Sequence, residues 1–233
     1  MPAVQTFAEE ETAAATTDST QTAEEDRETQ RQKCYAIASD SNSVENWPQG
    51  PATYADSAIV MDMNSGAVLY SKQIEKKHYP ASITKLLTTL VALDNAELTD
   101  TVEFSQDSIS FLEYGDAHIG MTPGEQISME DALYAVLLAS ANEVSYAVAE
   151  SVGKKMGGGY DTFIQAMNDE SEKLGCTGSH WTNANGLHDE QHYTTAHDMA
   201  RIGAAVYQKE AFRTISQSLS LSLIHISEPT RPY

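Results

Sequence analysis

Ser82 and Lys85 stand three residues apart in a stretch that we expect to form the first turn of a helix. Positions i and i+3 share one face of a helix, so the Ser82 hydroxyl and the Lys85 amine can approach each other. A serine hydroxyl is a weak nucleophile until a neighbouring base removes its proton. Lysine can be that base if burial and positive potential lower its pKa. The pair therefore indicates nucleophilic attack on a carbonyl, whose oxyanion the helix N-terminus would stabilise.

The Ser-x-x-Lys motif is weak by itself, because a chain of 233 residues should contain about one copy by chance. A second copy occurs at Ser151 and Lys154, so the motif alone decides nothing. The surroundings of the first copy favour a helix. Pro80 suits a helix start, and an apolar face follows it, formed by Leu86, Leu87, Leu90, Val91 and Leu93.

Ser140 and Asn142 form the only Ser-x-Asn of the chain, and they fall at a break between two predicted helices. A short loop at this point can direct both side chains into a cleft. The Ser140 hydroxyl could relay a proton to a leaving amine, and the Asn142 amide could hold both a substrate amide and Lys85.

The elements expected around these residues are mostly helices. Strands at 58–63 and 67–70 flank a turn at 64–66, and 101–105 is a further short strand. Helices are expected from 82 to about 94, from a cap at Ser128, at 143–152, at 163–174 and from a cap at Thr195. This pattern predicts an α+β fold in which helices pack around a small antiparallel sheet.

Composition restricts the partners but does not settle the compartment. The formal net charge of −20 argues against nucleic acid or an anionic membrane as a partner. Residues 1–52 are acidic and poor in apolar side chains, so we expect a disordered tail, and residues 1–8 resemble the end of a signal peptide. No segment is long and apolar enough to span a bilayer. Cys34 and Cys176 do not make a disulfide framework.

The C-terminal residues require separate treatment. The stretch from 221 to 231 resembles the translation of a transposase adapter used in DNA library preparation. We therefore expect residues 218–233 to be an artefact and the natural gene to continue past about Gln217.

The predicted strands, the Ser82 and Ser140 motifs and the later loops follow one another in an order that resembles the penicillin-binding-protein type of serine D-Ala-D-Ala carboxypeptidase. The resemblance covers the strands from Ala58, the Ser82 motif, Pro123-Gly124-Glu125, the Ser140 motif, and residues 182–189 and 192–196. It implies a β-lactamase/transpeptidase-like fold whose catalytic domain, residues 53–217, is truncated and whose sheet is incomplete. It also implies that Ser82 is the acylated nucleophile, that Lys85 is its general base, and that Ser140 and Asn142 form the second motif.

The same resemblance implies an activity. The substrate would be a peptidoglycan stem peptide ending in D-Ala-D-Ala, with β-lactam antibiotics as acylating inhibitors and no cofactor. The protein would act outside the cytoplasmic membrane, with a membrane anchor a possibility for the missing C-terminal part. The family's third motif, Lys-Thr-Gly, is absent, because Cys176-Thr177-Gly178 lacks the cation and comes too early. We therefore expect this chain to be impaired as an enzyme.

Several alternatives stay open at this stage. A muropeptide endopeptidase fits the same motifs, and so does a non-hydrolytic penicillin-binding sensor. A class A β-lactamase would need a placed glutamate in a Glu-x-x-x-Asn loop, which the sequence lacks, and a Gly-x-Ser-x-Gly hydrolase motif is also absent. His188, His192 and His197 could suggest a metal site, but loop polarity and helix capping explain them more simply.

Overall fold

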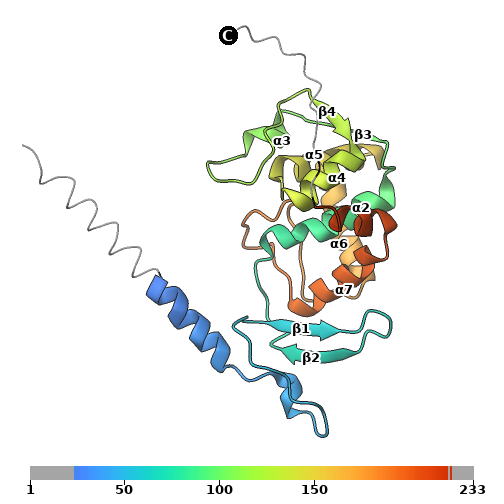
Figure 1. The fold of residues 1–233 in the computed structure, drawn as a ribbon. Coiled ribbons are helices and arrows are strands. Elements are labelled where there is room, and N and C mark those ends of the chain that lie inside the picture. Colours follow the sequence, from blue (N-terminus) through green and yellow to red (C-terminus); the bar gives the residue numbers. More distant parts are fainter. Residues whose placement is uncertain (1–23, 220, 222–233) are drawn as a thin grey trace, which may run out of the picture. The chain divides into compact units, whose positions relative to one another are not determined.

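A computed structural model describes residues 24–219 and residue 221 (Figure 1). The described residues form two compact units, one up to residue 74 and one from residue 75 onward. The sequence predicted one domain over residues 53–217, whereas the structure groups the 58–72 hairpin with the residues that precede it. The expected signal-peptide remnant and residues 220 and 222–233 of the expected adapter segment lie outside the described residues.

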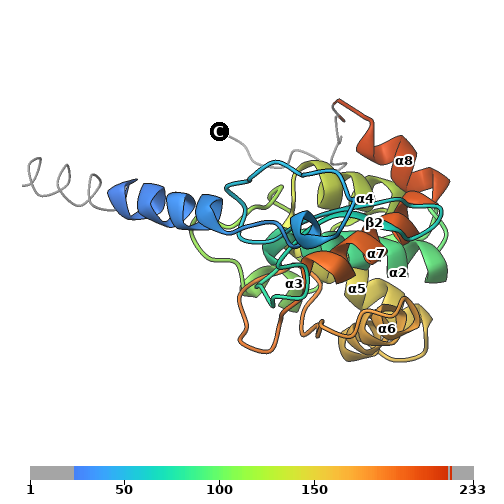
Figure 2. The ribbon, with the colours of Figure 1, turned by 90° about the horizontal axis from the view of Figure 1, so that it is seen from below.

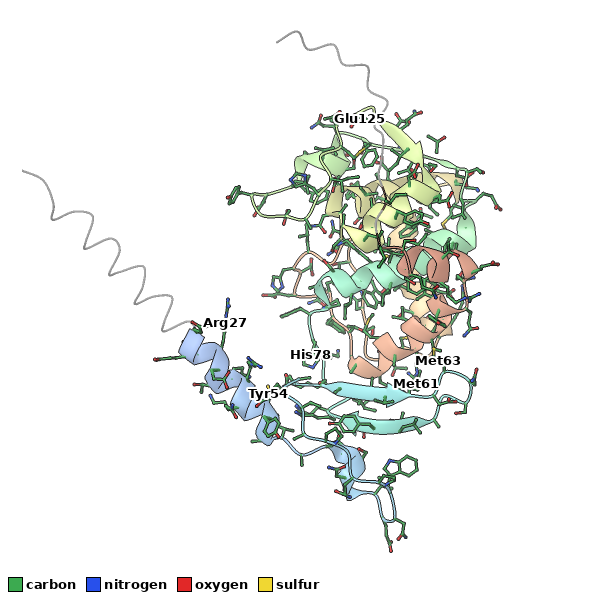
Figure 3. The ribbon with its side chains drawn as sticks, in the orientation of Figure 1. Arg27, Tyr54, Met61, Met63, His78 and Glu125 are labelled. Atoms are coloured by element: carbon green, nitrogen blue, oxygen red, sulfur yellow. The ribbon has the colours of Figure 1, made fainter. Side chains whose placement is uncertain are left out.

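The first unit is built on an antiparallel hairpin of β1 (Ala58–Met61) and β2 (Val68–Lys72). The predicted turn between them is present: Gly66 has a φ of +72°, which glycine adopts readily, and the Asp62 carboxylate accepts a hydrogen bond from the Ser65 amide at 2.8 Å. Met61 ends β1, and Figure 3 shows Met61 and Met63 on this hairpin.

The expectation of disorder over residues 1–52 is wrong for the part that is described. A helix spans residues 24–36 and a 3₁₀ helix, η1, spans Asp40–Ser43. Tyr54, labelled in Figure 3, lies with its ring centroid 4.6 Å from that of Tyr35 on the helix. The Tyr70 hydroxyl of β2 donates to the Pro51 carbonyl at 2.9 Å. Polar and aromatic contacts to the hairpin thus order a stretch whose low apolar content suggested that it could not fold.

The second unit contains most of the helices. Its elements in chain order are η2 (Ala81–Thr84), α2 (Lys85–Asn95), β3 (Thr101–Glu103), α3 (Asp107–Ser110), β4 (Gln126–Ser128), α4 (Met129–Leu138), α5 (Asn142–Lys155), α6 (Tyr160–Lys173), α7 (Ala196–Tyr207) and α8 (Glu210–Ser216). Helix α2 is central and contacts α4, α5, α6 and α7 (Figures 1 and 2). Strands β3 and β4 pair antiparallel.

The core of this unit forms where the apolar faces of α2 and α5 meet. Leu87, Leu90 and Val91 of α2 are almost completely buried, as are Val144 and Val148 of α5. Burying side chains of this size contributes roughly 1.5–3 kcal/mol each. The apolar spacing that predicted the buried face of α2 therefore identifies residues that pack this helix into the core.

Two predicted helix caps are confirmed. The Ser128 hydroxyl accepts a hydrogen bond from the Asp131 amide at 3.1 Å, and the Thr195 hydroxyl accepts one from the Asp198 amide at 3.1 Å. The prediction missed α3, β4 and α8, which have four, three and seven residues. Elements this short carry too few residues for a periodic pattern. The predicted α+β class, with helices and small antiparallel sheets, is confirmed.

No helix in the described part of the chain is long and apolar enough to cross a membrane.

Candidate active site

Ser82 lies in the 3₁₀ helix η2, one turn before Lys85 opens α2. A 3₁₀ helix has 3.0 residues per turn, so side chains at i and i+3 eclipse each other. Lys85 Nζ accordingly lies 3.2 Å from Ser82 Oγ and donates a hydrogen bond to it. The sequence predicted this proximity from α-helical geometry; the tighter helix produces it more directly. Ser82 itself is exposed, so a substrate can reach its hydroxyl.

Lys85 is 2% exposed, and two further acceptors hold its ammonium. Its Nζ donates to Asn142 Oδ1 at 2.7 Å and to the Asn185 carbonyl at 2.6 Å. Asn142 is the first residue of α5, and Asn185 lies in the loop before α7. The structure therefore brings together three of the four predicted site residues, Ser82, Lys85 and Asn142.

Burial sets the protonation of Lys85. Loss of solvation lowers its pKa to about 8, while the carboxylates of Glu143 and Asp116 oppose this effect. Roughly a tenth of the amine is then neutral at pH 7. A neutral amine keeps two N–H groups for Asn142 and Asn185 and gains a lone pair that can accept the Ser82 proton. This arrangement can activate a serine nucleophile.

Ser140, the fourth predicted residue, lies at the break between α4 and α5. Its φ is +55°, a left-handed conformation that costs a residue with a side chain roughly 1–2 kcal/mol. Two backbone bonds flank the strained residue: Ala141 N donates to the Ala135 carbonyl at 3.2 Å, and Asn142 N donates to the Ala117 carbonyl at 2.8 Å. Its half-buried hydroxyl makes no hydrogen bond to the other three site residues in the described structure. Chain proximity to Asn142 is what associates Ser140 with the site.

The loop at 182–189 contributes a site group to which the sequence reasoning gave no role, the Asn185 carbonyl. Thr88 Oγ1 of α2 donates to the neighbouring Ala184 carbonyl at 2.7 Å, which fixes the loop beside Lys85. Gly186 has a φ of +86°, and a Cβ there would collide with the Ala81 carbonyl next to Ser82. The density of asparagine and glycine in this loop was the signal that could have identified it.

A buried histidine ties this loop to the nucleophile's helix. The Thr182 amide donates to His192 Nδ1 at 3.0 Å, so Nε2 carries the proton and donates to Thr84 Oγ1 at 2.8 Å. Burial lowers the pKa of His192 to about 4. His197 bonds to Glu75 at 2.7 Å. Two of the three histidines considered as metal ligands thus have partners within the protein.

The second Ser-x-x-Lys and the two cysteines make contacts that do not involve Ser82 or Lys85. Ser151 accepts a hydrogen bond from the Glu103 amide at 3.4 Å, and Lys154 pairs with Glu150 at 2.9 Å on the same helix. Both cysteines are buried and free. Burial raises the pKa of the Cys176 thiol to about 11, so this thiol stays protonated.

The chain is similar in sequence to known proteins. Residues 44–221 match the family model described as D-alanyl-D-alanine carboxypeptidase. The chain is 32% identical over 162 residues to the D-alanyl-D-alanine carboxypeptidase DacF of Bacillus subtilis, covering 67% of this chain and 40% of that protein. It is 31% identical over 180 residues to DacC of Escherichia coli, covering 74% of this chain and 44% of that protein.

Solved structures show the same likeness. The D-alanyl-D-alanine carboxypeptidase of Mycobacterium tuberculosis has a TM-score of 0.63 and 31% identity, covering 77% of this chain and 64% of that chain. Penicillin binding protein 5 of Haemophilus influenzae has a TM-score of 0.63 and 28% identity, covering 69% and 47%. The chain spans less than half the length of the two curated relatives described above. From the family match over residues 44–221, the chain belongs to the D-alanyl-D-alanine carboxypeptidase family.

Proposed function

We propose that this chain carries the acylation site of a serine D-Ala-D-Ala carboxypeptidase. The observation that carries the proposal is the buried Lys85 amine, which lies 3.2 Å from Ser82 Oγ and 2.7 Å from Asn142 Oδ1. An amine whose pKa is lowered to about 8 next to an exposed hydroxyl has the properties of a general base beside a nucleophile.

In the proposed reaction, neutral Lys85 takes the Ser82 proton while Ser82 Oγ attacks the carbonyl carbon of the penultimate D-Ala. The Asn142 amide keeps Lys85 oriented throughout the transfer. The tetrahedral intermediate collapses by breaking the peptide C–N bond. The proton that Lys85 took from Ser82 passes through the Ser140 hydroxyl to the nitrogen of the terminal D-Ala, which leaves as a free amine while Lys85 becomes neutral again. Water then hydrolyses the Ser82 ester and regenerates the hydroxyl.

The substrate class follows from the family. A peptidoglycan stem peptide ending in D-Ala-D-Ala would present the scissile amide, and a β-lactam would acylate Ser82 in its place. Such substrates lie outside the cytoplasmic membrane, so we place the protein there.

The absence of a Lys-Thr-Gly from the sequence bears on the rate. In this family that motif would supply a lysine for the substrate carboxylate and an oxyanion-hole N–H. Loss of one oxyanion donor typically lowers a rate by roughly 10²–10³-fold. We therefore propose that a polypeptide of this sequence acylates slowly, compared with a chimera in which residues 44–217 are followed by the Lys-Thr-Gly part of a relative.

The test is labelling with a fluorescent penicillin, with the labelled residue mapped by mass spectrometry. We expect a stoichiometric adduct on Ser82 in the chimera, slower labelling of the unaltered chain, and no adduct in either protein after Ser82→Ala. Ser151→Ala is the matched control, because it removes the serine of the second Ser-x-x-Lys. Labelling that persists in Ser82→Ala would place the nucleophile elsewhere.

A further inference from the structure

Glu143 follows Asn142 in the first turn of α5, and its side chain is completely buried. Its Oε1 accepts a hydrogen bond from the Ile119 amide at 2.7 Å. Its Oε2 is also buried but has no hydrogen-bond partner among the described residues. Burying a carboxylate is costly unless opposite charge or hydrogen bonds compensate for the lost solvation. Its burial therefore calls for a compensating interaction beyond the single bond to Ile119.

The hydrogen bonds of this turn fix the segment that crosses it. The Asn142 amide donates to the Ala117 carbonyl at 2.8 Å, and the Ile119 amide donates to Glu143 two residues further along. These two bonds hold residues 117–119 against the turn that carries Asn142. Asn142 is the residue whose Oδ1 accepts from Lys85, so Glu143 is one residue away from a direct contact of the candidate base.

The groups that bond to Lys85 or act on its charge come from four parts of the second unit. They are Ser82 of η2, Asn142 and Glu143 of α5, Asn185 of the 182–189 loop, and Asp116 of the connection between α3 and β4. Of these, Glu143 and Asp116 are the carboxyl groups, and both raise the pKa of Lys85, Glu143 more strongly. Asp116 is only half-buried and caps its own turn, accepting from the Glu113 amide at 2.9 Å, so water screens it more than Glu143.

We propose that Glu143 is a positioning residue that holds residues 117–119 on the first turn of α5 and stabilises the Lys85 ammonium formed when Ser82 gives up its proton. The inference rests on the proposed function, since it concerns Lys85 as the base. Burial alone makes Lys85 easy to deprotonate but a poor acceptor of the Ser82 proton. A buried carboxylate restores that basicity without forming a direct ion pair that would compete for the amine.

The experiment titrates Lys85 by NMR in protein labelled with [13Cε]lysine, with the resonance assigned by its absence in Lys85→Met. Glu143→Gln keeps the shape and an oxygen acceptor for Ile119 but removes the charge. We expect the pKa of Lys85 to fall by roughly 1 unit in Glu143→Gln. Glu150→Gln is the matched control: Glu150 lies on the same helix and also has a buried Oε2 without a hydrogen-bond partner, but it does not act on Lys85. An equal Lys85 pKa in native protein and Glu143→Gln overturns the inference.

A second variant separates the charge from the geometry and serves if Glu143→Gln does not fold. Glu143→Asp keeps the charge but shortens its reach by one methylene. We expect its Lys85 pKa to stay near the native value, while the Ile119 amide exchanges with solvent at least tenfold faster. If the Ile119 amide of Glu143→Asp exchanges with solvent at the same rate as in the native protein, the positioning role is wrong.

Both measurements use protein without substrate. They therefore give a result even if penicillin fails to label Ser82, so failure of the proposed function and failure of this inference are distinguishable.

Discussion

Each unit of the molecule buries one lysine, and the two are used differently. Lys72 of the first unit is 0% exposed and Lys85 of the second is 2% exposed. Each ammonium has three donors and makes three hydrogen bonds. Lys72 Nζ donates to the carbonyls of Cys34, Thr53 and Ala55 at 2.6–2.8 Å. Burial and the number of bonds are thus the same at both sites.

The acceptors differ, and this difference carries the chemistry. All three partners of Lys72 are backbone carbonyls, which can accept hydrogen bonds but cannot donate them. A neutral Lys72 would therefore lose one hydrogen bond and gain none. One partner of Lys85 is the Ser82 hydroxyl, at 3.2 Å the longest of its three bonds. If Lys85 loses its proton, that hydroxyl can donate to it instead. A buried lysine can therefore be a structural clamp or a base, depending on whether one acceptor can become a donor.

Removing each lysine should separate these roles, and the largest effect is expected at the base. Lys85→Met should lower the rate of Ser82 acylation by roughly 10²–10⁴-fold, the range typical of a lost general base. The measurement is the rate of fluorescent penicillin labelling of the chimera with and without Lys85→Met, with circular dichroism to check the fold. A rate within tenfold of the native rate would show that Lys85 is not the base.

Lys72→Met should instead unfold the first unit more easily. It leaves three backbone carbonyls without their shared donor, which we expect to cost about 3 kcal/mol. Urea denaturation followed by tryptophan fluorescence measures the change, in a Trp181→Phe background that leaves Trp47 of this unit as the remaining tryptophan. Lys33→Met is the control: Lys33 is exposed on the 24–36 helix, and its loss should change stability by less than about 0.5 kcal/mol. If Lys72→Met and Lys33→Met are equally stable, Lys72 does not stabilise the first unit through its three hydrogen bonds.

The pH dependence of acylation sharpens the comparison. Lys85 must be neutral to accept a proton, so the labelling rate should rise with pH, roughly tenfold per unit well below the pKa, and level off above about 8. The folded-state pKa lies below the unfolded value of 10.5, so protonation costs the folded state more. The contribution of Lys85 to stability should therefore increase as pH rises from about 8 to 10.5. A flat rate between pH 6 and 9 would exclude Lys85 as the titrating group.

The smallest effect is expected from the loop that supplies the third acceptor of Lys85. The Tyr160 hydroxyl accepts a hydrogen bond from the buried Ala184 amide at 3.0 Å, next to Asn185. Tyr160→Phe leaves that amide unpaired, which should cost about 1–2 kcal/mol of stability and lower acylation a few-fold. Tyr146→Phe is the control, because its ring stacks on Tyr160 at 4.1 Å but its hydroxyl has no hydrogen bond in the described structure. Equal stability and equal acylation rates in the two variants would show that the Tyr160 hydroxyl does not stabilise the loop.

The sequence by itself determined the features that depend on residues close in the chain. The spacing of Ser82 and Lys85, the Asp62 turn and the caps at Ser128 and Thr195 each involve groups three or four positions apart. Side-chain type and helical or turn geometry fix such contacts before any packing occurs. Asn142 was placed near Lys85 from the Ser-x-Asn at a break between helices, and the family resemblance supported that placement.

Only the tertiary structure decided what surrounds the lysines. Asn142 and Asn185 are 57 and 100 residues from Lys85 along the chain, and Asn142 reaches Lys85 only when α5 packs against α2. The fold of residues 24–52 was mispredicted for the same reason, since its support comes from β2. The depth of burial that lowers the pKa of Lys85 is a property of the packed unit, and residue spacing does not encode it.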